Sequence, residues 1–390
     1  MTSPRSVIEP LLFYLLVGLG GLMVAIGAAG AYQLEEHGHA ITGMNNQIVW
    51  GLPHVFAILM IVAASGVLNV ATVGSVFGQA AYKARAPLSG LLSVALLAGG
   101  LTVLMLDLGR PDRIVVAATH FNFKSVFAWN VFLYSGLFAI VAAYLWSMME
   151  RRMNGWSKPL GIAALAWRFS LTTGTGSIFG FLVARQAYQS AVLAPMFIIM
   201  SLAWGLAVFL VVQAVMYAWV GERLPQAIQS RLAHLLAVFV AATAYFVLAY
   251  HLTNLYYARQ GAFERFLLVD GGAYPSLFWL GYVGVGTIVP LALLLHPRLG
   301  GPRSALLASV FVLAGAAAEL YVFIIGGQAF PLDMFPGYTV SSSFGDGVIA
   351  EYVPSLPELS LGIGGIGVAF VMTTIGVRIF RFLPQDDLTA

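Results

Sequence analysis

Long apolar stretches of about twenty residues recur along nearly the whole chain, separated by short segments rich in polar residues, glycine and proline. A helix of that length crosses the hydrocarbon core of a membrane, which is roughly 30 Å thick. The pattern therefore predicts an all-α, polytopic membrane protein that forms one integral membrane domain. We expect about ten spans, near residues 10–32, 52–77, 88–107, 125–148, 160–184, 193–220, 232–257, 275–295, 304–326 and 359–382.

The connections between the predicted spans are short except for two, near residues 33–51 and 327–358. The second contains several glycines, prolines and aromatic residues, which favours an ordered cap over a floppy linker. Three roles stay open for it: a lid over a site, a platform for a partner, or a cover for helix ends. The fifth span is the least regular, because Arg168 interrupts it.

Composition agrees with a membrane protein, since 60% of the 390 residues are hydrophobic and 9% are charged. The sequence has no cysteine, which excludes disulfides, thiol catalysis and any cysteine-ligated iron–sulfur or zinc site. No residue pattern predicts a metal site. The apolar stretch from Leu11 to Ala31 is longer than a signal-peptide core, and we interpret it as an uncleaved first span.

Basic residues are unevenly distributed between the two sides. With ten spans, twelve of the 19 Lys and Arg residues lie on the side of the termini, and most acids lie on the other side. Because positively charged loops stay in the cytoplasm, we expect a multi-pass protein of the cytoplasmic (inner) membrane with both termini cytoplasmic. The 327–358 loop would then be periplasmic.

The residues 106–113 read Leu-Asp-Leu-Gly-Arg-Pro-Asp-Arg, where the third span reaches the membrane surface. An acid at that depth is costly, which points either to proton chemistry or to a helix-end acid paired with Arg110 or Arg113. His54 follows Pro53 at the same predicted depth. A histidine and a carboxylate from neighbouring helices would form a proton acceptor and donor suited to a quinol.

Other polar residues gather at this predicted depth. Trp129 and Asn130 open the fourth span, and Arg185 and Gln186 close the fifth. The aromatic ring and the amides could hold a quinone, and Arg185 could pair with Asp107. Interfacial anchoring is the alternative for Trp129.

Glu319 is the one carboxylate predicted deep within a span, and Arg168 is its candidate ion partner. An intramembrane acid suggests a proton path. The same pair could instead serve a proton-coupled secondary transporter, which is the first alternative function.

Two histidines at matched depth can ligate haem. His54 and His251 are both predicted near the outer face, so a haem b membrane cytochrome is the second alternative. His37, His39, His120 and His296 fall in predicted loops, where we expect them to be solvated.

The Asp107–Arg113 run, followed by Phe-Lys-Ser at 123–125 and Trp129-Asn130, resembles the membrane subunits of the NrfD/polysulfide reductase family. Within it, the ten-span layout resembles the longer, DsrP branch, which belongs to complexes linked to dissimilatory sulfite reductase. The resemblance covers essentially the whole sequence.

The resemblance implies two four-helix bundles with flanking helices and a site for menaquinone or ubiquinone near the outer face, with no haem or iron–sulfur cluster in the chain itself. It also implies a periplasmic, ferredoxin-like iron–sulfur partner. A multihaem cytochrome c and haem b or heterodisulfide-reductase-like subunits are further possible partners.

Carried over to this sequence, the resemblance assigns quinone binding and proton uptake to His54 and Asp107. It places Glu319 in the second bundle, where some relatives have a suggested proton path. We therefore expect a quinone-reactive membrane subunit of a respiratory or sulfur-metabolism redox complex, with Arg110, Trp129, Asn130, Arg185 and Gln186 shaping the pocket.

Overall fold

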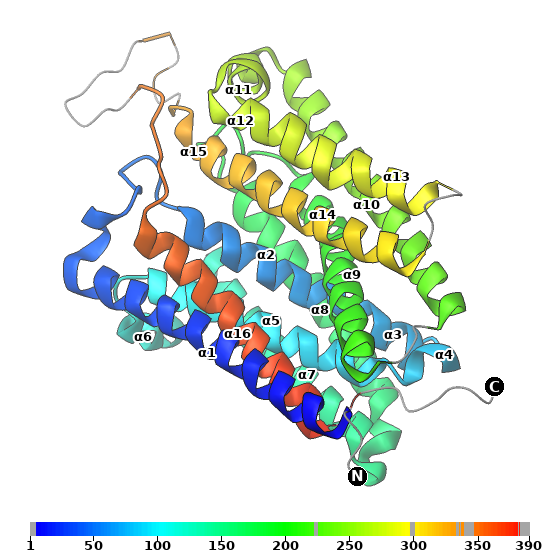
Figure 1. The fold of residues 1–390 in the computed structure, drawn as a ribbon. Coiled ribbons are helices and arrows are strands. Elements are labelled where there is room, and N and C mark those ends of the chain that lie inside the picture. Colours follow the sequence, from blue (N-terminus) through cyan, green and yellow to red (C-terminus); the bar gives the residue numbers. More distant parts are fainter. Residues whose placement is uncertain are drawn as a thin grey trace.

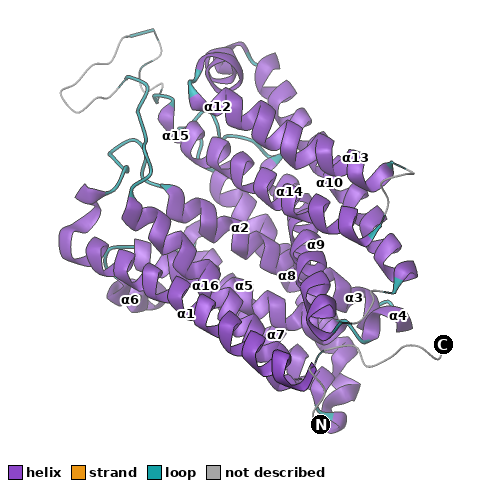
Figure 2. Cartoon of the chain, in the orientation of Figure 1, coloured by secondary structure: helices purple, strands orange, loops and turns teal. Residues whose placement is uncertain are grey.

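The computed structural model describes residues 5–221, 225–296, 301–332, 335, 337–338, 347–380 and 382. Within these ranges the protein is built from helices and loops, with no strand (Figure 2). The long helices are α1 (Arg5–His37), α2 (Leu52–Val67), α5 (Ala86–Asp107), α7 (Val126–Met149), α8 (Ser157–Gly180), α9 (Leu193–Val220), α10 (Gln226–Tyr256), α14 (Pro302–Tyr321) and α16 (Leu356–Phe380). The all-α membrane fold expected from the sequence is confirmed.

Several shorter elements extend or connect these helices. After a one-residue break at Leu68, α3 (Asn69–Ser75) continues α2. The eighth span consists of α12 (Ala273–Ser276), a wider π-helical segment η6 (Leu277–Ile288) and α13 (Val289–Leu295). The ninth continues from α14 through a second π-helical segment, η7 (Val322–Gly326), into α15 (Gly327–Ala329). The remaining short elements are η1 (Gly38–Ile41), α4 (Ala80–Lys83), η2 (Pro111–Arg113), α6 (Ile114–Thr119), η3 (Arg151–Trp156), η4 (Ala258–Gln260), α11 (Gly261–Arg265) and η5 (Phe266–Asp270).

Helices cover all ten ranges in which we expect spans, with ends that differ by a few residues. Nine helical segments of the described residues are long and apolar enough to cross a membrane. The fifth range is the exception: α8 has 24 residues, enough for a span, but it is more polar than the others. Arg168 lies buried in its middle, against α2 and α3.

The packing of the helices divides them into two groups. In the first, α5 packs on α2 and α7, and α8 packs on α7 and α2. In the second, α14 packs on α9, α13 and η6, and α10 packs on α9 and α13. The groups meet where α9 contacts α2 and α8, and α1 and α16 flank the first group by pairing with each other and packing on α5. Figure 1 shows the pair α1 and α16 along one side of the molecule, with α10, α13 and α14 on the opposite side.

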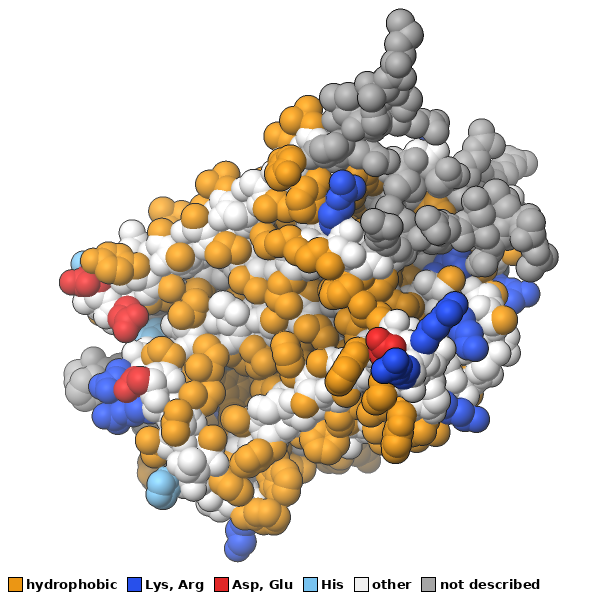
Figure 3. Space-filling model, turned by 90° about the horizontal axis from the view of Figure 1, so that it is seen from below, with side chains coloured by type: hydrophobic (Ala, Val, Ile, Leu, Met, Phe, Trp, Pro, Cys, Tyr) orange, Lys and Arg blue, Asp and Glu red, His pale blue; other side chains and the backbone are white. Residues whose placement is uncertain are grey.

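The beginning of α1 and the end of α16 lie at the same end of the bundle (Figure 1), which we call the terminal side. The opposite end holds Asp107 and the start of α2, and we call it the motif side. In the face shown in Figure 3, charged side chains gather mostly toward these two ends, and hydrophobic side chains cover most of the surface between them. This is the pattern of a protein whose middle faces lipid.

Small residues allow the two groups to approach closely where α2 meets α9. A β-carbon added at Gly66 would lie 1.5 Å from the carbonyl oxygen of Ser201, and one added at Gly205 would lie 2.2 Å from the amide nitrogen of Val67. Membrane helices associate through such close backbone contacts, because lipid provides no hydrophobic drive between them. The junction of the groups therefore depends on these glycines.

We predict that Gly66→Ala destabilises the fold by roughly 1–3 kcal/mol, because its methyl group would overlap α9. The midpoint of thermal unfolding in mild detergent measures this effect. Gly18→Ala on α1 is the matched control, since a β-carbon there meets nothing within 4 Å. If both variants unfold at the wild-type temperature, the α2–α9 contact described here is incorrect.

Candidate functional site

The imidazole of His54 and the carboxylate of Asp107 face each other on the motif side. Nδ1 of His54 lies 3.0 Å from Oδ2 of Asp107, although the angles are not those of a hydrogen bond. Both carboxylate oxygens of Asp107 are buried and have no hydrogen-bond partner among the described residues. The structure therefore brings the two residues together from neighbouring helices, as expected. Both oxygens of Asp107 remain able to accept hydrogen bonds.

The local sequence explains how Asp107 reaches this position. It is the last residue of α5, and Gly109 follows with a left-handed backbone (φ +69°) that ends the helix. Arg110 turns away from Asp107, and its guanidinium forms two hydrogen bonds with Asp112, at 2.9 and 3.0 Å. This pairing lowers the pKa of Asp112. The expected alternative, Asp107 paired with Arg110 or Arg113, is thus not what the structure shows.

His39 is a third member of the site, which we did not expect from the sequence. Its Nε2 donates to the backbone carbonyl of Asp107 at 2.9 Å and lies 3.8 Å from Oδ1 of the same residue. His39 is only partly solvated, with a side chain that is 39% exposed against 2% for Asp107, and its contact with Asp107 was not expected. The sequence signal is Gly38, whose left-handed backbone (φ +68°) turns the chain after α1.

A cavity of about 620 Å³ opens beside His54 between α2, α5, α7 and α8. Its walls are mainly apolar, and aromatic side chains from three different segments contribute to them. The residues that line it are Trp50, His54, Ile58, Leu101, Leu104, Met105, Leu108, Arg110, Arg113, Ile114, Phe127, Asn130, Val131, Tyr134, Ser135, Ile178, Phe179 and Ile324. An apolar cleft with a few polar groups of this kind suits a small aromatic ligand.

Asn130 gives this cavity a second polar group. Its amide nitrogen donates to the carbonyl of Val126 at 2.8 Å, which fixes the side chain, and its Oδ1 is buried without a hydrogen-bond partner in the described residues. Gly174 on α8 makes room for it, since a β-carbon there would lie 3.2 Å from Oδ1. Asn130 and Arg110 are thus the two further expected residues that do line the cavity.

Trp129 lies outside this cavity. Its indole donates to the carbonyl of Phe123 at 2.8 Å, and the residue is 42% exposed. It lines a separate groove between α7 and α8 together with Lys124 and Phe169. Adjacent residues of a helix point in different directions, and here Asn130 lines the cavity beside His54 whereas Trp129 lines the separate groove.

Arg185 and Gln186 also lie outside the residues that line the cavity. Arg185 donates to the carbonyls of Gln47 at 2.6 Å and Gln328 at 3.2 Å, so it does not pair with Asp107. Partial burial lowers its pKa from the ordinary value. Its contacts join the segment before α2 to α15, so Arg185 holds the backbone near the site and does not contact the cavity.

Gln328 fixes the same segment, and sequence reasoning missed it. Its side chain is completely buried and forms four hydrogen bonds, all with backbone groups. The Oε1 atom accepts from the amides of Val49 and Trp50, at 3.0 and 3.1 Å. The Nε2 atom donates to the carbonyls of Trp50 and Ile324, at 3.0 and 2.8 Å. Gln328 thereby holds Trp50, which stacks against His54 with 6.1 Å between ring centroids.

Glu358, at the start of α16, also holds the segment before α2 and the start of α2. It is fully buried at the beginning of α16 and accepts from the amides of Gly43 at 3.0 Å and Ser355 at 2.8 Å. It also accepts from the hydroxyl of Tyr352 at 2.6 Å. The hydroxyl oxygen of Tyr352 in turn accepts from the amide of Leu52. The described part of the long second connection thus packs on the segment before His54. Phe335 and Gly337 are described, whereas Pro336 and Asp346 of this loop lie outside the described residues.

A second buried polar centre lies in the other helix group. Nδ1 of His251 on α10 lies 2.7 Å from Oε2 of Glu264, whose Oε1 accepts from Asn254 at 2.7 Å. Glu264 falls between the seventh and eighth predicted spans, but it is completely buried on α11. His251 therefore faces this acid rather than His54, and it does not line the cavity beside His54. The histidine pair required by the haem alternative is not formed.

Glu319 is buried at this second centre, and its Oε2 has no hydrogen-bond partner within the described part of the protein. Arg168 lies elsewhere: it donates to Asn69 at 2.6 Å and to the carbonyl of Ser65 at 3.5 Å. The two residues form no ion pair, so the expected Arg168–Glu319 partnership is wrong. The transporter alternative loses the pair on which it rested.

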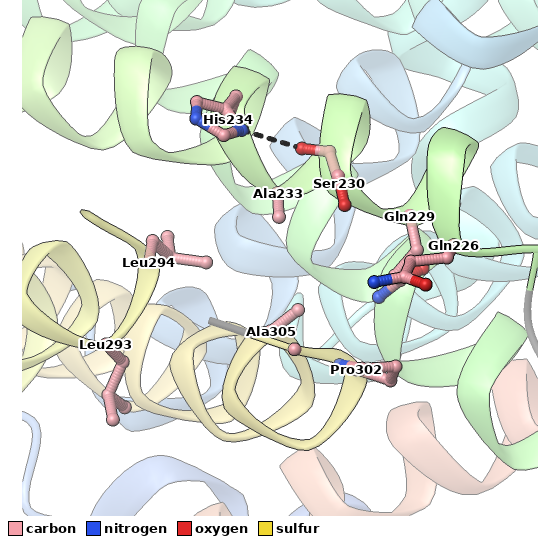
Figure 4. A pocket seen from close by; sticks show the side chains of 10 residues that line it. Gln226, Gln229, Ser230, Ala233, His234, Leu293, Leu294, Pro302 and Ala305 are labelled. Atoms are coloured by element: carbon pink, nitrogen blue, oxygen red, sulfur yellow. Dashed lines mark hydrogen bonds between the residues drawn. The ribbon is translucent and has the colours of Figure 1, made fainter. Parts of the chain in front are cut away.

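Figure 4 shows a smaller cavity, of about 120 Å³, at the terminal side between the starts of α10 and α14. Gln226, Gln229 and His234 contribute to it, and Nδ1 of His234 lies 2.9 Å from the carbonyl of Ser230. Its lining contains no carboxylate. Nor do the described residues include a group of three or more His, Asp or Glu side chains that could hold a metal ion. We therefore take the cavity beside His54, on the motif side, as the candidate functional site.

The sequence is similar to known membrane subunits of redox complexes over most of its length. Residues 40–332 match the family model described as "Polysulphide reductase, NrfD". The sequence is 28% identical to the Hdr-like menaquinol oxidoreductase integral membrane subunit of Archaeoglobus fulgidus, over 93% of each protein. It is 23% identical to a selenate reductase subunit of Mesobacillus selenatarsenatis, over 91% of each protein. It is 25% identical to the protein NrfD of Escherichia coli, over 72% of this sequence and 95% of that one.

We predict that Gln328→Leu loosens the segment before α2, because four hydrogen bonds are lost and buried backbone groups are left unpaired. Hydrogen–deuterium exchange should show faster exchange of the amides of Val49 and Trp50, by about tenfold or more for a loss of roughly 1.4 kcal/mol or more. Gln189→Leu, at an exposed position, is the control. Unchanged exchange in Gln328→Leu would show that this amide does not hold the segment.

Proposed function

Because this chain belongs to the NrfD polysulphide reductase family, we propose that it is a quinone-reactive integral membrane subunit of an oxidoreductase complex. The observation that carries the proposal is the His54–Asp107 contact beside an apolar cavity of about 620 Å³. A quinone ring needs an apolar slot, and its two oxygens need groups that hydrogen-bond and exchange protons. The cavity supplies both.

Each polar residue of the cavity has a distinct role in this proposal. His54 exchanges the proton, because its Nδ1 faces Asp107 and leaves Nε2 as the ring nitrogen for the ligand. Asp107 orients the imidazole and stabilises its protonated form. Asn130 offers its unpaired Oδ1 to a quinol hydroxyl, and Arg110 adds positive charge at the rim. Trp50 and Phe179 contribute flat apolar faces for the ring.

We propose that the electrons pass to or from another protein, since this sequence has no cysteine to hold an iron–sulfur cluster of its own. We propose an iron–sulfur, ferredoxin-like subunit on the motif side, close to the cavity. The name of the Archaeoglobus relative, which refers to menaquinol and to an Hdr-like complex, favours menaquinone over ubiquinone and a heterodisulfide-reductase-like partner. The DsrP branch, with a multihaem cytochrome c, a haem b subunit and a role in sulfur metabolism, is the specific form we favour.

The orientation follows from the charges of the connections. We propose that the terminal side, to which the ten-span prediction assigns twelve of the 19 Lys and Arg residues, faces the cytoplasm. The membrane is then the cytoplasmic membrane, and His54 and Asp107 lie near its outer surface. The described residues of the 327–358 connection would face the periplasm.

We also propose that Glu319 handles protons in the second helix group. Its buried Oε2 and the buried hydroxyl of Tyr282 both have no hydrogen-bond partner in the described part of the protein. A buried acid with spare hydrogen-bonding capacity is suited to take up and release a proton. Arg168 has no part in this proposal, since its contacts hold α8 to α2 and α3.

We predict that Asp107→Asn lowers quinol oxidation by the purified complex by about 100-fold or more, the range that general acid–base catalysis contributes. The assay is the rate of electron transfer from menadiol to an artificial acceptor. Asp270→Asn is the matched control, because Asp270 is an exposed acid paired with Arg265. An Asp107→Asn rate within twofold of wild type would remove the acid from the mechanism.

For Glu319 we predict a spectroscopic change. Glu319→Gln should remove a carboxylic-acid C=O band from the infrared difference spectrum between the oxidised and reduced complex, and leave the KM for menadiol unchanged. Glu351→Gln, at an exposed position, should leave the band in place. Persistence of the complete band pattern in Glu319→Gln would contradict the proposal.

A further inference from the structure

His39 occupies a position that the proposed quinone chemistry does not yet use. Among the described residues, it is the second imidazole near Asp107, beside the carboxylate oxygen that His54 does not face, and it is partly exposed to solvent. His54 lies 3.0 Å from Oδ2 of Asp107, and His39 Nε2 lies 3.8 Å from Oδ1. The three side chains are thus ordered as imidazole, carboxylate and imidazole.

The carboxylate of Asp107 is buried between two imidazoles that are each partly exposed. The His54 side chain is 21% exposed and lines the cavity, and the carboxylate of Asp107 is 2% exposed. The side chain of His39 is 39% exposed and does not line the cavity. A proton that enters at His54 therefore cannot leave Asp107 directly into water, but it can leave from His39.

The local backbone keeps His39 in place for this transfer. Its Nε2 donates to the carbonyl of Asp107 at 2.9 Å, so a shift of about 1 Å brings the same nitrogen within hydrogen-bond distance of Oδ1. Gly109 leaves the space for the ring, since a β-carbon there would lie 3.2 Å from Cε1 of His39. Oδ1 has no other hydrogen-bond partner among the residues that the structure describes.

The other acid near His39 is not available as a proton acceptor. Glu358 acts on His39 electrostatically, but its two oxygens already accept three hydrogen bonds, from Gly43, Ser355 and Tyr352. Asp107 is therefore the carboxylate with a free oxygen. Asp107 and His39 can each gain and lose a proton, as a proton relay requires. The hydrogen bond from His39 to the Asp107 carbonyl does not by itself require a histidine at position 39.

We propose that His39 is the exit residue of a proton relay, His54–Asp107–His39, that connects the quinone cavity with the aqueous phase on the motif side. The proposal rests on the proposed function. When a quinol is oxidised, its two electrons go to the partner's iron–sulfur centre and its two protons leave in succession. Each proton moves from a quinol hydroxyl to His54 Nε2, while Nδ1 releases one to Asp107. Asp107 passes it to His39 Nε2 when the His39 ring carries its own proton on Nδ1. Nδ1 then releases that proton to water, and the Nε2–H that remains is the donor to the Asp107 carbonyl seen in the structure. Each imidazole regains its starting tautomer before the second proton passes. Quinone reduction uses the same path in reverse.

His39→Gln tests the relay, because glutamine can still donate to the carbonyl of Asp107 but cannot carry a proton. In the purified complex, menadiol oxidation should fall by about tenfold or more in kcat, with an unchanged KM, since His39 does not touch the cavity. Added imidazole should restore much of the rate. His37→Gln, at an exposed histidine in the preceding turn, should behave as wild type with or without imidazole.

Two outcomes overturn the relay: a wild-type rate in His39→Gln, or a loss that imidazole does not restore and that comes with a raised KM. If His39→Gln does not assemble, His39→Glu provides the test, since a carboxylate can also carry protons and should retain more activity than His39→Ala. Failure of the proposed function is recognised separately, because wild-type complex would then not oxidise menadiol at all. Full activity of His39→Gln beside an inactive Asp107→Asn would reject the relay alone.

Discussion

A buried carboxylate at the end of a membrane span is the constraint around which the motif side is organised. An unpaired acid within a membrane is expensive, and the side chain of Asp107 is only 2% exposed. The protein compensates with two imidazoles rather than with an arginine, although Arg110 and Arg113 follow in the same motif. A guanidinium would neutralise the charge permanently, whereas an imidazole can gain and lose a proton near neutral pH. Under the proposed function, this choice of partners leaves Asp107 able to exchange protons with them.

The position of His54 depends on parts of the protein that are far away in sequence. Gln328 and Arg185 hold the segment from Gln47 to Trp50, and Glu358 and Tyr352 hold Gly43 and Leu52. Each contact is a side chain bonded to backbone groups of a loop, which would otherwise remain unpaired at the edge of the membrane. The first helix group therefore supplies most of the cavity, while the second group and α16 hold the segment before α2 that carries Trp50.

The sequence was informative where hydrophobicity alone predicts a helix, and where the free-energy cost of a charge in the membrane singles out a residue. The apolar stretches predicted the helices, and the scarcity of charge singled out Asp107, His54 and Glu319. Its limits appear where a role depends on contacts between distant segments. His39 and Glu264 looked like loop residues, because nothing in their neighbours along the sequence reveals that Asp107 and His251 face them. Gln328 had no signal at all, since a neutral amide at a helix end is compatible with almost any role. Trp129 and Asn130 illustrate a different limit, because adjacent helical residues point in different directions.

The two polar centres are separated by packed aromatic rings. Trp50 contacts Phe179 with centroids 5.5 Å apart, Phe179 contacts Phe323 at 5.0 Å, and Phe323 contacts Tyr250 at 6.2 Å, next to His251. These rings form an apolar layer between His54 and His251. In the proposed relay, protons from the cavity leave on the motif side, where His39 meets solvent. The structure also joins the two centres through the backbone. The continuous helical segment from α14 to α15 carries the buried Glu319 and, at its end, Gln328, which holds Trp50 against His54.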